Sequence, residues 1–474
     1  MSAQTETMAA QEPDRTSQVR IQLSTQSPDI ELPESTGPIL VSTELRRIQL
    51  STLVNRLLST TKPVPFEFLI NGTFLRTSID DFLNENGISA ETTLQVEYVR
   101  AQIPPQHVAS FQHDDWVSSI DILSSTSPSG RSPDSNIDAS SACLLSASYD
   151  GLLRTWSSAG SLISASPLAH AGPIKSARFV SPSLVASSGL DRTVRLWNYD
   201  SNTFTPVLDV YAHTASVDQI SVHSPTQKII SASSDGTLAL FNSTASSLPA
   251  APPNLLPPPS SKRRKTSHPT RSSDVPTRGP LSILKSHSAP VSDVTFTPTD
   301  STVAYSTSLD HTLKTWDLTT SVCVDTRPTS HALLSVHPLQ SLNLVAAGTS
   351  ARHISLIDPR ANATRVVAGT LRGHTNAVVA LAGNPGSEYG LVSGGHDGSV
   401  RGWDVRMAAA GMGSGGEEGA GKGGEAVFVL DREGMEGKKK VGGEGVKVFD
   451  VCWDGEWGLL SAGEDKRVQV HRER

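Results

Sequence analysis

The sequence has few cysteines, few aromatic residues and no long apolar run. Its 474 residues include three cysteines, Cys143, Cys323 and Cys452, with no C-x-x-C spacing, so neither a disulfide framework nor a thiolate zinc site is indicated. No stretch approaches the roughly 18 consecutive apolar residues of a membrane-spanning helix. The first thirty residues lack the basic-then-apolar plan of a secretory leader. We therefore expect a cytosolic or nuclear protein.

Positive charge is not in excess either. Lysine and arginine total 40 against 47 acidic residues, which gives a net charge of −7. A protein coated in basic charge for nucleic acid is therefore not indicated, although a local basic patch remains compatible with this balance.

An internal repeat is the strongest signal that the sequence does contain. Six segments share a frame in which an aspartate stands six residues before an aromatic residue or a histidine. A seventh segment, 348–358, keeps this frame but has Arg352 in the aspartate position and Asp358 in the aromatic position. The six regular pairs are Asp150 with Trp156, Asp191 with Trp197, Asp235 with Phe241, Asp310 with Trp316, Asp397 with Trp403, and Asp465 with His471.

Most of these frame positions are about 41 to 45 residues apart, and two longer intervals require insertions. Polar, proline-rich and glycine-rich stretches account for the additional length. Their composition cannot form a core, so they are insertions rather than parts of a repeat. We expect disordered inserts at 124–140, 243–280 and 407–425. The remainder of residues 105–474 then fits seven repeats.

Each frame contains an alternating apolar segment, which is the period of a half-buried strand. A histidine stands about 20 to 23 residues before most of the frame positions, at His170, His213, His287, His331 and His374. This set resembles the WD repeat, in which each blade has four antiparallel strands around a central channel. Because the set recurs about once per blade, we interpret it as a buried structural network rather than as a Ser-His-Asp hydrolase triad.

Residues 17–101 have a different pattern, which predicts a small α+β domain. Strand candidates lie at 19–25, 39–45, 66–72, 74–78 and 93–101, one amphipathic helix is expected at 50–59, and a short helical turn at 78–87. This order is typical of a ubiquitin-like (β-grasp) domain. Residues 1–16 are expected to be a disordered tail. The predicted fold is thus an all-β, seven-bladed WD-repeat propeller preceded by a ubiquitin-like domain.

Two motifs in the inserts could carry chemistry. Gly411, Gly413 and Gly416 match a dinucleotide-binding pattern, and residues 416–422 match part of a phosphate-binding loop. No strand and helix flank them and Gly423 replaces the required Ser or Thr, so we reject nucleotide binding. The basic run Lys262, Arg263, Arg264 and Lys265 predicts a nuclear localisation signal, with an RNA contact or a merely solvated loop as alternatives.

Taken together, the two parts of the chain resemble a known family. Segments 62–105, 113–122, 308–318, 349–360 and 394–406 closely resemble the YTM-type WD-repeat ribosome biogenesis factors, which carry a notchless-like N-terminal domain. The resemblance implies a non-enzymatic scaffold without cofactors, located in the nucleus, nucleolus and nucleoplasm. It further implies a role in maturation of 60S precursor particles and pre-rRNA processing, in a complex with pescadillo and the block-of-proliferation propeller protein.

The same resemblance implies a site in the N-terminal domain. In this family the midasin ATPase binds the ubiquitin-like domain, and an acidic side chain completes the coordination of a magnesium ion that midasin holds. Matching the family segment onto residues 87–98 places this carboxylate at Glu91, with Asp80, Asp81 and Glu85 as acidic neighbours. A carboxylate is a suitable ligand for such a hard cation.

Two other functions stay open at this stage. A cytoplasmic WD-repeat adaptor for signalling or for a ubiquitin ligase would use the same fold and would not need the basic run. An enzyme hidden in the propeller channel is the other alternative, but no nucleophile-base pair, metal cluster or cofactor loop supports it.

Overall fold

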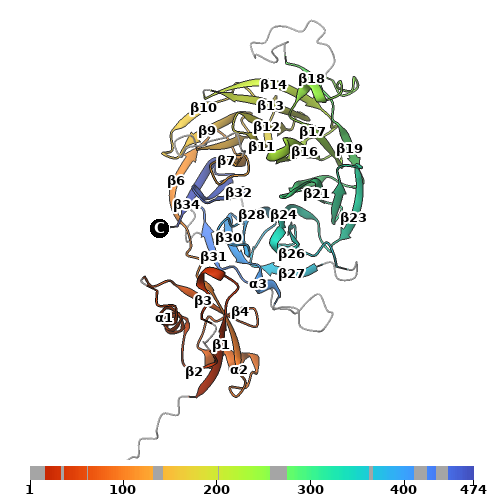
Figure 1. Cartoon of the computed structure of the whole chain (residues 1–474). Helices are drawn as coiled ribbons and strands as arrows, with labels where there is room; N and C mark the ends of the chain where they lie inside the picture. Colours follow the sequence, from red (N-terminus) through yellow and green to blue (C-terminus); the bar gives the residue numbers. More distant parts are fainter. Residues whose placement is uncertain are drawn as a thin grey trace, which may run out of the picture. The chain divides into compact units, whose positions relative to one another are not determined.

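A computed structural model describes residues 17–33, 37–60, 62–131, 142–200, 202–256, 275–361, 367–409, 424–433 and 447–473. The chain divides into two compact units, Met1–Ile103 and Pro104–Arg474 (Figure 1). Within the described ranges, no helix is long and apolar enough to cross a membrane.

The first unit is built on one mixed sheet with the strand order β2-β1-β5-β3-β4. The central strand β5 runs parallel to its neighbour β1, and the other pairs are antiparallel. The strands are β1 (Gln18–Ser24), β2 (Ile39–Ser42), β3 (Phe66–Ile70), β4 (Thr73–Phe74) and β5 (Leu94–Arg100), and the helices are η1 (Pro28–Ile30), α1 (Arg47–Leu57) and α2 (Ile79–Asn86).

Helix α1 begins three residues before the predicted start. The backbone amide of Arg46 donates to Gln49 Oε1 at 2.9 Å, which satisfies a donor at the N-terminus and allows the first turn to form. Leu50 and Val54 on the inner side of α1 are buried in a core that also contains Phe68. This core belongs to the first unit alone, so the unit has its own apolar interior.

Among the described residues of the second unit, the strands form seven sheets, here numbered 1 to 7 along the chain. Sheets 1 to 3 contain β7 (Val117–Leu123), β8 (Cys143–Ser148), β9 (Leu153–Ser157) and β10 (Leu162–Ala165); β11 (Ile174–Ser181), β12 (Leu184–Gly189), β13 (Thr193–Asp200), β14 (Thr203–Tyr211) and β18 (Thr277–Arg278); and β15 (Val217–His223), β16 (Lys228–Ser233), β17 (Thr237–Asn242) and β19 (Ser282–Lys285).

Sheets 4 to 7 repeat this plan with four strands each. They contain β20 (Val291–Thr297), β21 (Asp300–Ser308), β22 (Thr312–Asp317) and β23 (Val322–Pro328); β24 (Leu333–Leu339), β25 (Leu344–Thr349), β26 (His353–Ile357) and β27 (Val367–Arg372); β28 (Val378–Gly383), β29 (Gly390–Gly395), β30 (Ser399–Asp404) and β31 (Phe428–Asp431); and β32 (Val448–Asp454), β33 (Gly458–Gly463), β34 (Arg467–Arg472) and β6 (Gln106–Gln112). Short helices are η2 (Ser224–Thr226), η3 (Ala245–Ser247), η4 (Gln340–Leu342) and α3 (Arg406–Ala409).

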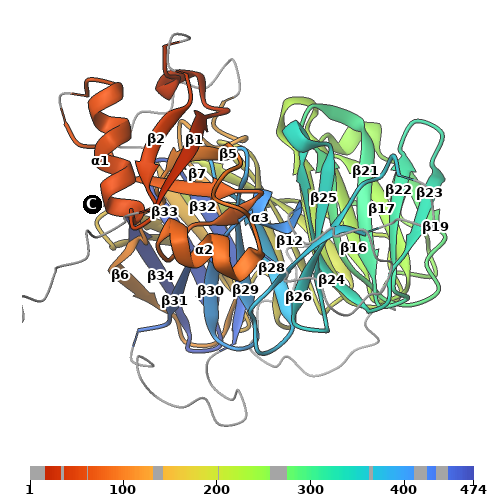
Figure 2. The same cartoon turned by 90° about the horizontal axis from the view of Figure 1, so that it is seen from below.

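The seven sheets close into a ring. The first strand of each sheet contacts the first strand of the next, in the cycle β7, β11, β15, β20, β24, β28, β32 and back to β7 (Figures 1 and 2). Sheet 7 takes its fourth strand, β6, from the start of the unit, and β6 pairs antiparallel with β34. This arrangement is a β-propeller, which confirms the propeller that the repeats predicted, and the β6–β34 pairing ties the two ends of the ring together.

The three predicted disordered inserts include residues at their edges that are ordered in the structure. In the first, Ser124 and Ser127 are buried, and Ser124 Oγ donates to Asp454 Oδ1 at 2.8 Å. In the second, Arg278 belongs to β18 and its Nε donates to the carbonyl of Ala245 at 3.0 Å. Residues 407–409 of the third belong to α3. Hydroxyl and guanidinium hydrogen bonds thus order segments that composition alone marked as unstructured. The tail 1–16, residues 132–141, 257–274 and 410–423 lie outside the described residues.

Candidate functional site

Sheet 2 shows the repeat network in full. His170 Nδ1 lies 2.9 Å from Asp191 Oδ1 and His170 Nε2 lies 2.8 Å from Ser187 Oγ. The indole Nε1 of Trp197 donates to the same Ser187 oxygen at 2.9 Å. The four side chains therefore form one chain of hydrogen bonds from the indole through the hydroxyl and the imidazole to the carboxylate.

The same contacts recur in sheets 3, 4 and 6. The histidine-aspartate distances are 3.3, 2.8 and 2.9 Å, and each histidine also contacts a buried serine. These sets are His213, Asp235 and Ser231; His287, Asp310, Ser306 and Trp316; and His374, Asp397, Ser393 and Trp403. Sheet 3 has Phe241 in place of the tryptophan and therefore lacks the indole donor.

Burial and hydrogen bonding act in opposite directions on these carboxylates. Burial raises the pKa of Asp310, but hydrogen bonds from Thr312 and His287 outweigh it and bring the pKa to about 2. The same balance holds the pKa of Asp191 and Asp397 below the ordinary aspartate value. The aspartates are thus ionised acceptors that hold their turns together.

Sheet 1 uses a histidine that the sequence analysis missed. His113 Nε2 lies 2.7 Å from Ser146 Oγ, and Trp156 Nε1 donates to the same oxygen at 2.9 Å. Asp150 instead accepts a hydrogen bond from Arg154 Nη1 at 2.7 Å. The predicted residues Asp150, in the turn between β8 and β9, and Trp156, on β9, do not share one network. The insert at 124–140 separates His113 from Asp150 and removed it from the expected spacing.

Sheet 7 replaces the histidine by an arginine, which no spacing pattern predicts. The Arg432 guanidinium donates through Nε and Nη2 to both carboxylate oxygens of Asp465, each at 2.8 Å, and through Nη1 to Ser461 Oγ at 3.2 Å. Arg432 is 1% exposed. A bidentate guanidinium therefore fills the place that an imidazole fills in the other sheets.

Among the described residues, sheet 5 has no such network. Gly348 stands where the other repeats have serine, and Arg352 and Asp358 stand in the aspartate and aromatic positions. His331 is exposed, and its ring lies 5.4 Å from that of His353. The degenerate frame seen in the sequence thus corresponds to a sheet without the His-Asp contact.

The geometry of these networks resembles a hydrolase triad, but their position excludes access. The serines at the centre of the networks in sheets 2, 4 and 6 are each 0% exposed, namely Ser187, Ser306 and Ser393. A nucleophile must reach its substrate. In the described part of the chain there is also no cluster of three metal-ligating side chains. Stabilisation of the turns is the role that this arrangement can perform.

Glu91 lies in the loop between α2 and β5, and its side chain is exposed. The backbone amide of Ile88 donates to the carbonyl of Leu83 at 2.9 Å, and Thr92 Oγ1 donates to the carbonyl of Ser89 at 2.8 Å. The first bond ties the start of the loop to α2, and the second closes a turn around Glu91. Within the described residues no hydrogen bond or ion pair engages the Glu91 carboxylate, so it is available to a ligand in solution.

The neighbouring carboxylates are less available. Asp81 Oδ2 accepts from Ser78 Oγ at 2.6 Å at the start of α2, and this bond lowers the pKa of Asp81. Asp80 Oδ2 accepts from Asn84 Nδ2 at 3.2 Å. Glu85 is exposed on the same helix. Glu91 and Glu85 therefore remain as the free acidic groups of this region, whereas the basic run Lys262 to Lys265 lies outside the described residues.

Comparison with family models agrees with this division. The NLE (NUC135) domain model matches residues 19–83, in the first unit. The model of the WD domain, G-beta repeat, matches residues 164–198, 204–242, 278–317 and 365–404. These four segments include the aspartates of sheets 2, 3, 4 and 6, which are the sheets with the His-Asp-Ser contacts described above.

Curated relatives match over nearly the whole chain. Ribosome biogenesis protein ytm1 of Neosartorya fischeri is 55% identical over 465 residues, which are 96% of this chain and 95% of that protein. The protein of the same name in Ajellomyces capsulatus is 55% identical over 98% of this chain, and the one in Aspergillus terreus is 52% identical over 100% of it. The resemblance drawn from the sequence is thus confirmed: the chain belongs to the Ytm1 family of ribosome biogenesis proteins.

Proposed function

We propose that this protein is a non-enzymatic scaffold in ribosome biogenesis. The observation that carries the proposal is the identity of about 55% to proteins named ribosome biogenesis protein Ytm1 over nearly the full length of both chains. The propeller supports a scaffold role because its repeated polar networks are buried and structural. We assign the seven sheets as seven blades and residues 17–101 as a ubiquitin-like domain, supported by the β2-β1-β5-β3-β4 order.

In this proposal the propeller joins pescadillo and the block-of-proliferation propeller protein on large-subunit precursors in the nucleolus and nucleoplasm, where pre-rRNA is processed. The basic run Lys262 to Lys265 directs nuclear entry, with ribosomal RNA as its alternative contact. Midasin then removes the protein by pulling on the N-terminal unit. The Glu91 carboxylate completes the coordination of the magnesium ion that midasin holds.

Two features of the structure support Glu91 in this role. Its carboxylate is exposed on a short loop that is tied to α2 by the Ile88–Leu83 hydrogen bond and closed into a turn by the Thr92–Ser89 bond. The described part of the chain has no cluster of metal ligands of its own, so a metal at Glu91 needs its other ligands from a partner. Only residues 101–105, including Pro104 and Pro105, separate β5 from β6, and such a short proline-containing link limits slack.

Affinity purification from cells tests the proposal. Wild type, Glu91→Ala and the control Glu85→Ala should all recover pescadillo, the block-of-proliferation protein and large-subunit precursors, while only Glu91→Ala loses midasin. Recovery of signalling or ubiquitin-ligase subunits in place of these proteins would refute the scaffold role. Equal recovery of midasin by all three forms would refute the role of Glu91 and leave the scaffold intact.

A further inference from the structure

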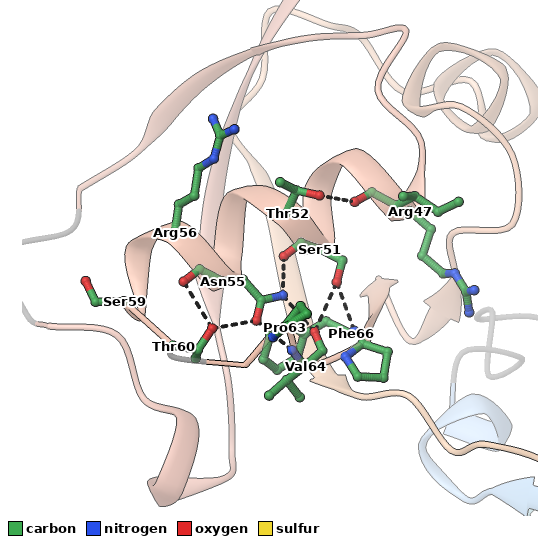
Figure 3. Close-up of a pocket in the computed structure, with 12 residues that line it drawn as sticks. Arg47, Ser51, Thr52, Asn55, Arg56, Ser59, Thr60, Pro63, Val64 and Phe66 are labelled. Atoms are coloured by element: carbon green, nitrogen blue, oxygen red, sulfur yellow. Dashed lines mark hydrogen bonds between the residues drawn. The ribbon is translucent and has the colours of Figure 1, made fainter. Parts of the chain in front are cut away.

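A groove runs along helix α1 in the first unit. It has a volume of about 620 Å³ and is lined on one side by α1 and on the other by Ser59, Thr60 and residues 63–66, the last of which begins β3 (Figure 3). Its apolar lining includes Ile48, which is 73% exposed, and the exposed Pro63 and Pro65. A volume of this size accommodates several side chains of a ligand.

Hydrogen bonds fix the shape of the groove. Asn55 Nδ2 donates to the carbonyl of Val64 at 2.7 Å, and Asn55 Oδ1 accepts from the Val64 amide at 2.8 Å. Ser51 Oγ accepts from the Phe66 amide at 3.1 Å, and the Pro65 carbonyl accepts from Ala101 at 2.9 Å. These backbone groups are already paired, so a ligand would be recognised here by side chains and not by an added β-strand.

Charge is distributed unevenly around this groove. Residues 46–66 contain the basic residues Arg46, Arg47, Arg56 and Lys62 and no acidic residue. Figure 3 shows Arg47 and Arg56 at opposite ends of the α1 segment that lines the groove. Arg47 shares the buried Glu67 with Arg76, at 3.0 and 3.8 Å, so one carboxylate serves two guanidinium groups. For Arg56, no partner lies within the described residues, and its side chain is exposed.

An acidic ligand fits the basic residues around the groove. The apolar lining indicates whether that ligand is a nucleic acid or a protein. RNA-binding grooves use exposed aromatic rings on which bases stack. Here the aromatic residue of the groove, Phe66, is 1% exposed, whereas its exposed apolar residues, Ile48, Pro63 and Pro65, are aliphatic. We propose that this groove binds a short acidic segment of a partner protein, with an apolar side chain against Ile48 and Pro63 and carboxylates beside Arg47 and Arg56. This surface is distinct from the Glu91 loop and acts independently of it.

Site-specific photo-crosslinking in cells tests the proposal. Benzoylphenylalanine replaces Ile48 in the full-length protein or, as the control, Leu40, which is 57% exposed on β2. Mass spectrometry then identifies the residues that each probe captures. We expect Ile48 to crosslink to one protein segment rich in Asp and Glu around an apolar residue, and Arg56→Glu to abolish this product. Crosslinks to RNA, to this chain itself or to a basic segment, or a yield no higher than at Leu40, would each overturn the proposal.

A binding measurement with the captured segment completes the test. The segment is synthesised with fluorescein, and its anisotropy is titrated with the full-length protein. Ile48→Asp and Arg56→Glu should each weaken binding at least tenfold, whereas Leu40→Asp and Arg20→Glu, which change exposed residues of β2 and β1, should change it less than twofold. Because all four side chains are exposed, the variants should melt like the wild type. If the two control variants weakened binding as much as Ile48→Asp and Arg56→Glu, specific binding in the groove would be refuted.

Discussion

Replacing Arg432 by methionine should destabilise the propeller by about 3 kcal/mol. The substitution removes two hydrogen bonds of 2.8 Å to Asp465, one of 2.7 Å to the carbonyl of Arg467 and one of 3.2 Å to Ser461 Oγ. Breaking a buried ion pair by removing one partner costs about 3–5 kcal/mol, because the other charge stays buried. The Asp465 side chain is 21% exposed and keeps the backbone amide of Arg467 and the side-chain amide of Gln469 as donors. The cost of losing Arg432 therefore lies at the lower end of this range, about 3 kcal/mol.

Differential scanning calorimetry measures this effect. An unfolding entropy of roughly 2 cal/mol/K per residue, summed over the propeller, gives about 0.8 kcal/mol/K, so a loss of 3 kcal/mol lowers Tm by about 4 °C. The control is Arg360→Met, since Arg360 is 65% exposed and pairs with Asp358 at 3.4 Å. Such surface pairs contribute about 0–1 kcal/mol, so its Tm should fall by about 1 °C or less. Similar shifts for both variants would refute the reasoning from burial.

Two further predictions concern the stability of the propeller. The pKa of Asp310 is about 2 in the folded protein, below that of an unfolded aspartate. The ionised carboxylate therefore contributes about 2 kcal/mol to the free energy of unfolding at neutral pH, and this contribution is lost as pH falls from about 4 towards 2. Calorimetry between pH 7 and pH 3 should show a smaller fall of Tm for Asp310→Asn than for wild type, and an equal fall would contradict this. Gly402→Ala should cost about 1–3 kcal/mol because the new Cβ overlaps the ring of Phe428. Gly172→Ala, whose Cβ meets only Leu190 at 3.7 Å, is the matched control and should melt within about 1 °C of wild type.

The repeated part of the fold could be predicted from the sequence because its signal is local. The aspartate and the aromatic residue of each frame belong to one turn and the strand after it, so their spacing does not depend on distant insertions. In the structure the ring nitrogens of His170, His287 and His374 lie 2.8 to 2.9 Å from the aspartates of their own repeats. In the first unit, the amphipathic helix expected at 50–59 from its apolar period corresponds to α1, which buries Leu50 and Val54.

The features that could not be predicted from the sequence depend on contacts that a spacing pattern does not contain. His113 occupies the histidine place of sheet 1 although an insert interrupts the spacing, and Arg432 performs the role of a histidine with different chemistry. The early start of α1 depends on the Arg46–Gln49 bond, which apolar periodicity does not record. The groove along α1 forms where residues 63–66 pack against the helix, and no sequence motif predicts that contact.

The most direct test of the proposed function is the sedimentation of the protein in cell extracts. Cells whose only copy carries Glu91→Ala or Glu85→Ala are compared with wild type on sucrose gradients, and the fraction that migrates with large-subunit precursors is quantified. We predict a several-fold increase of the bound fraction for Glu91→Ala alone, because midasin can no longer remove the protein. The same distribution for all three forms would contradict the proposed release through Glu91, and absence of the wild type from the precursor fractions would contradict the role in ribosome biogenesis.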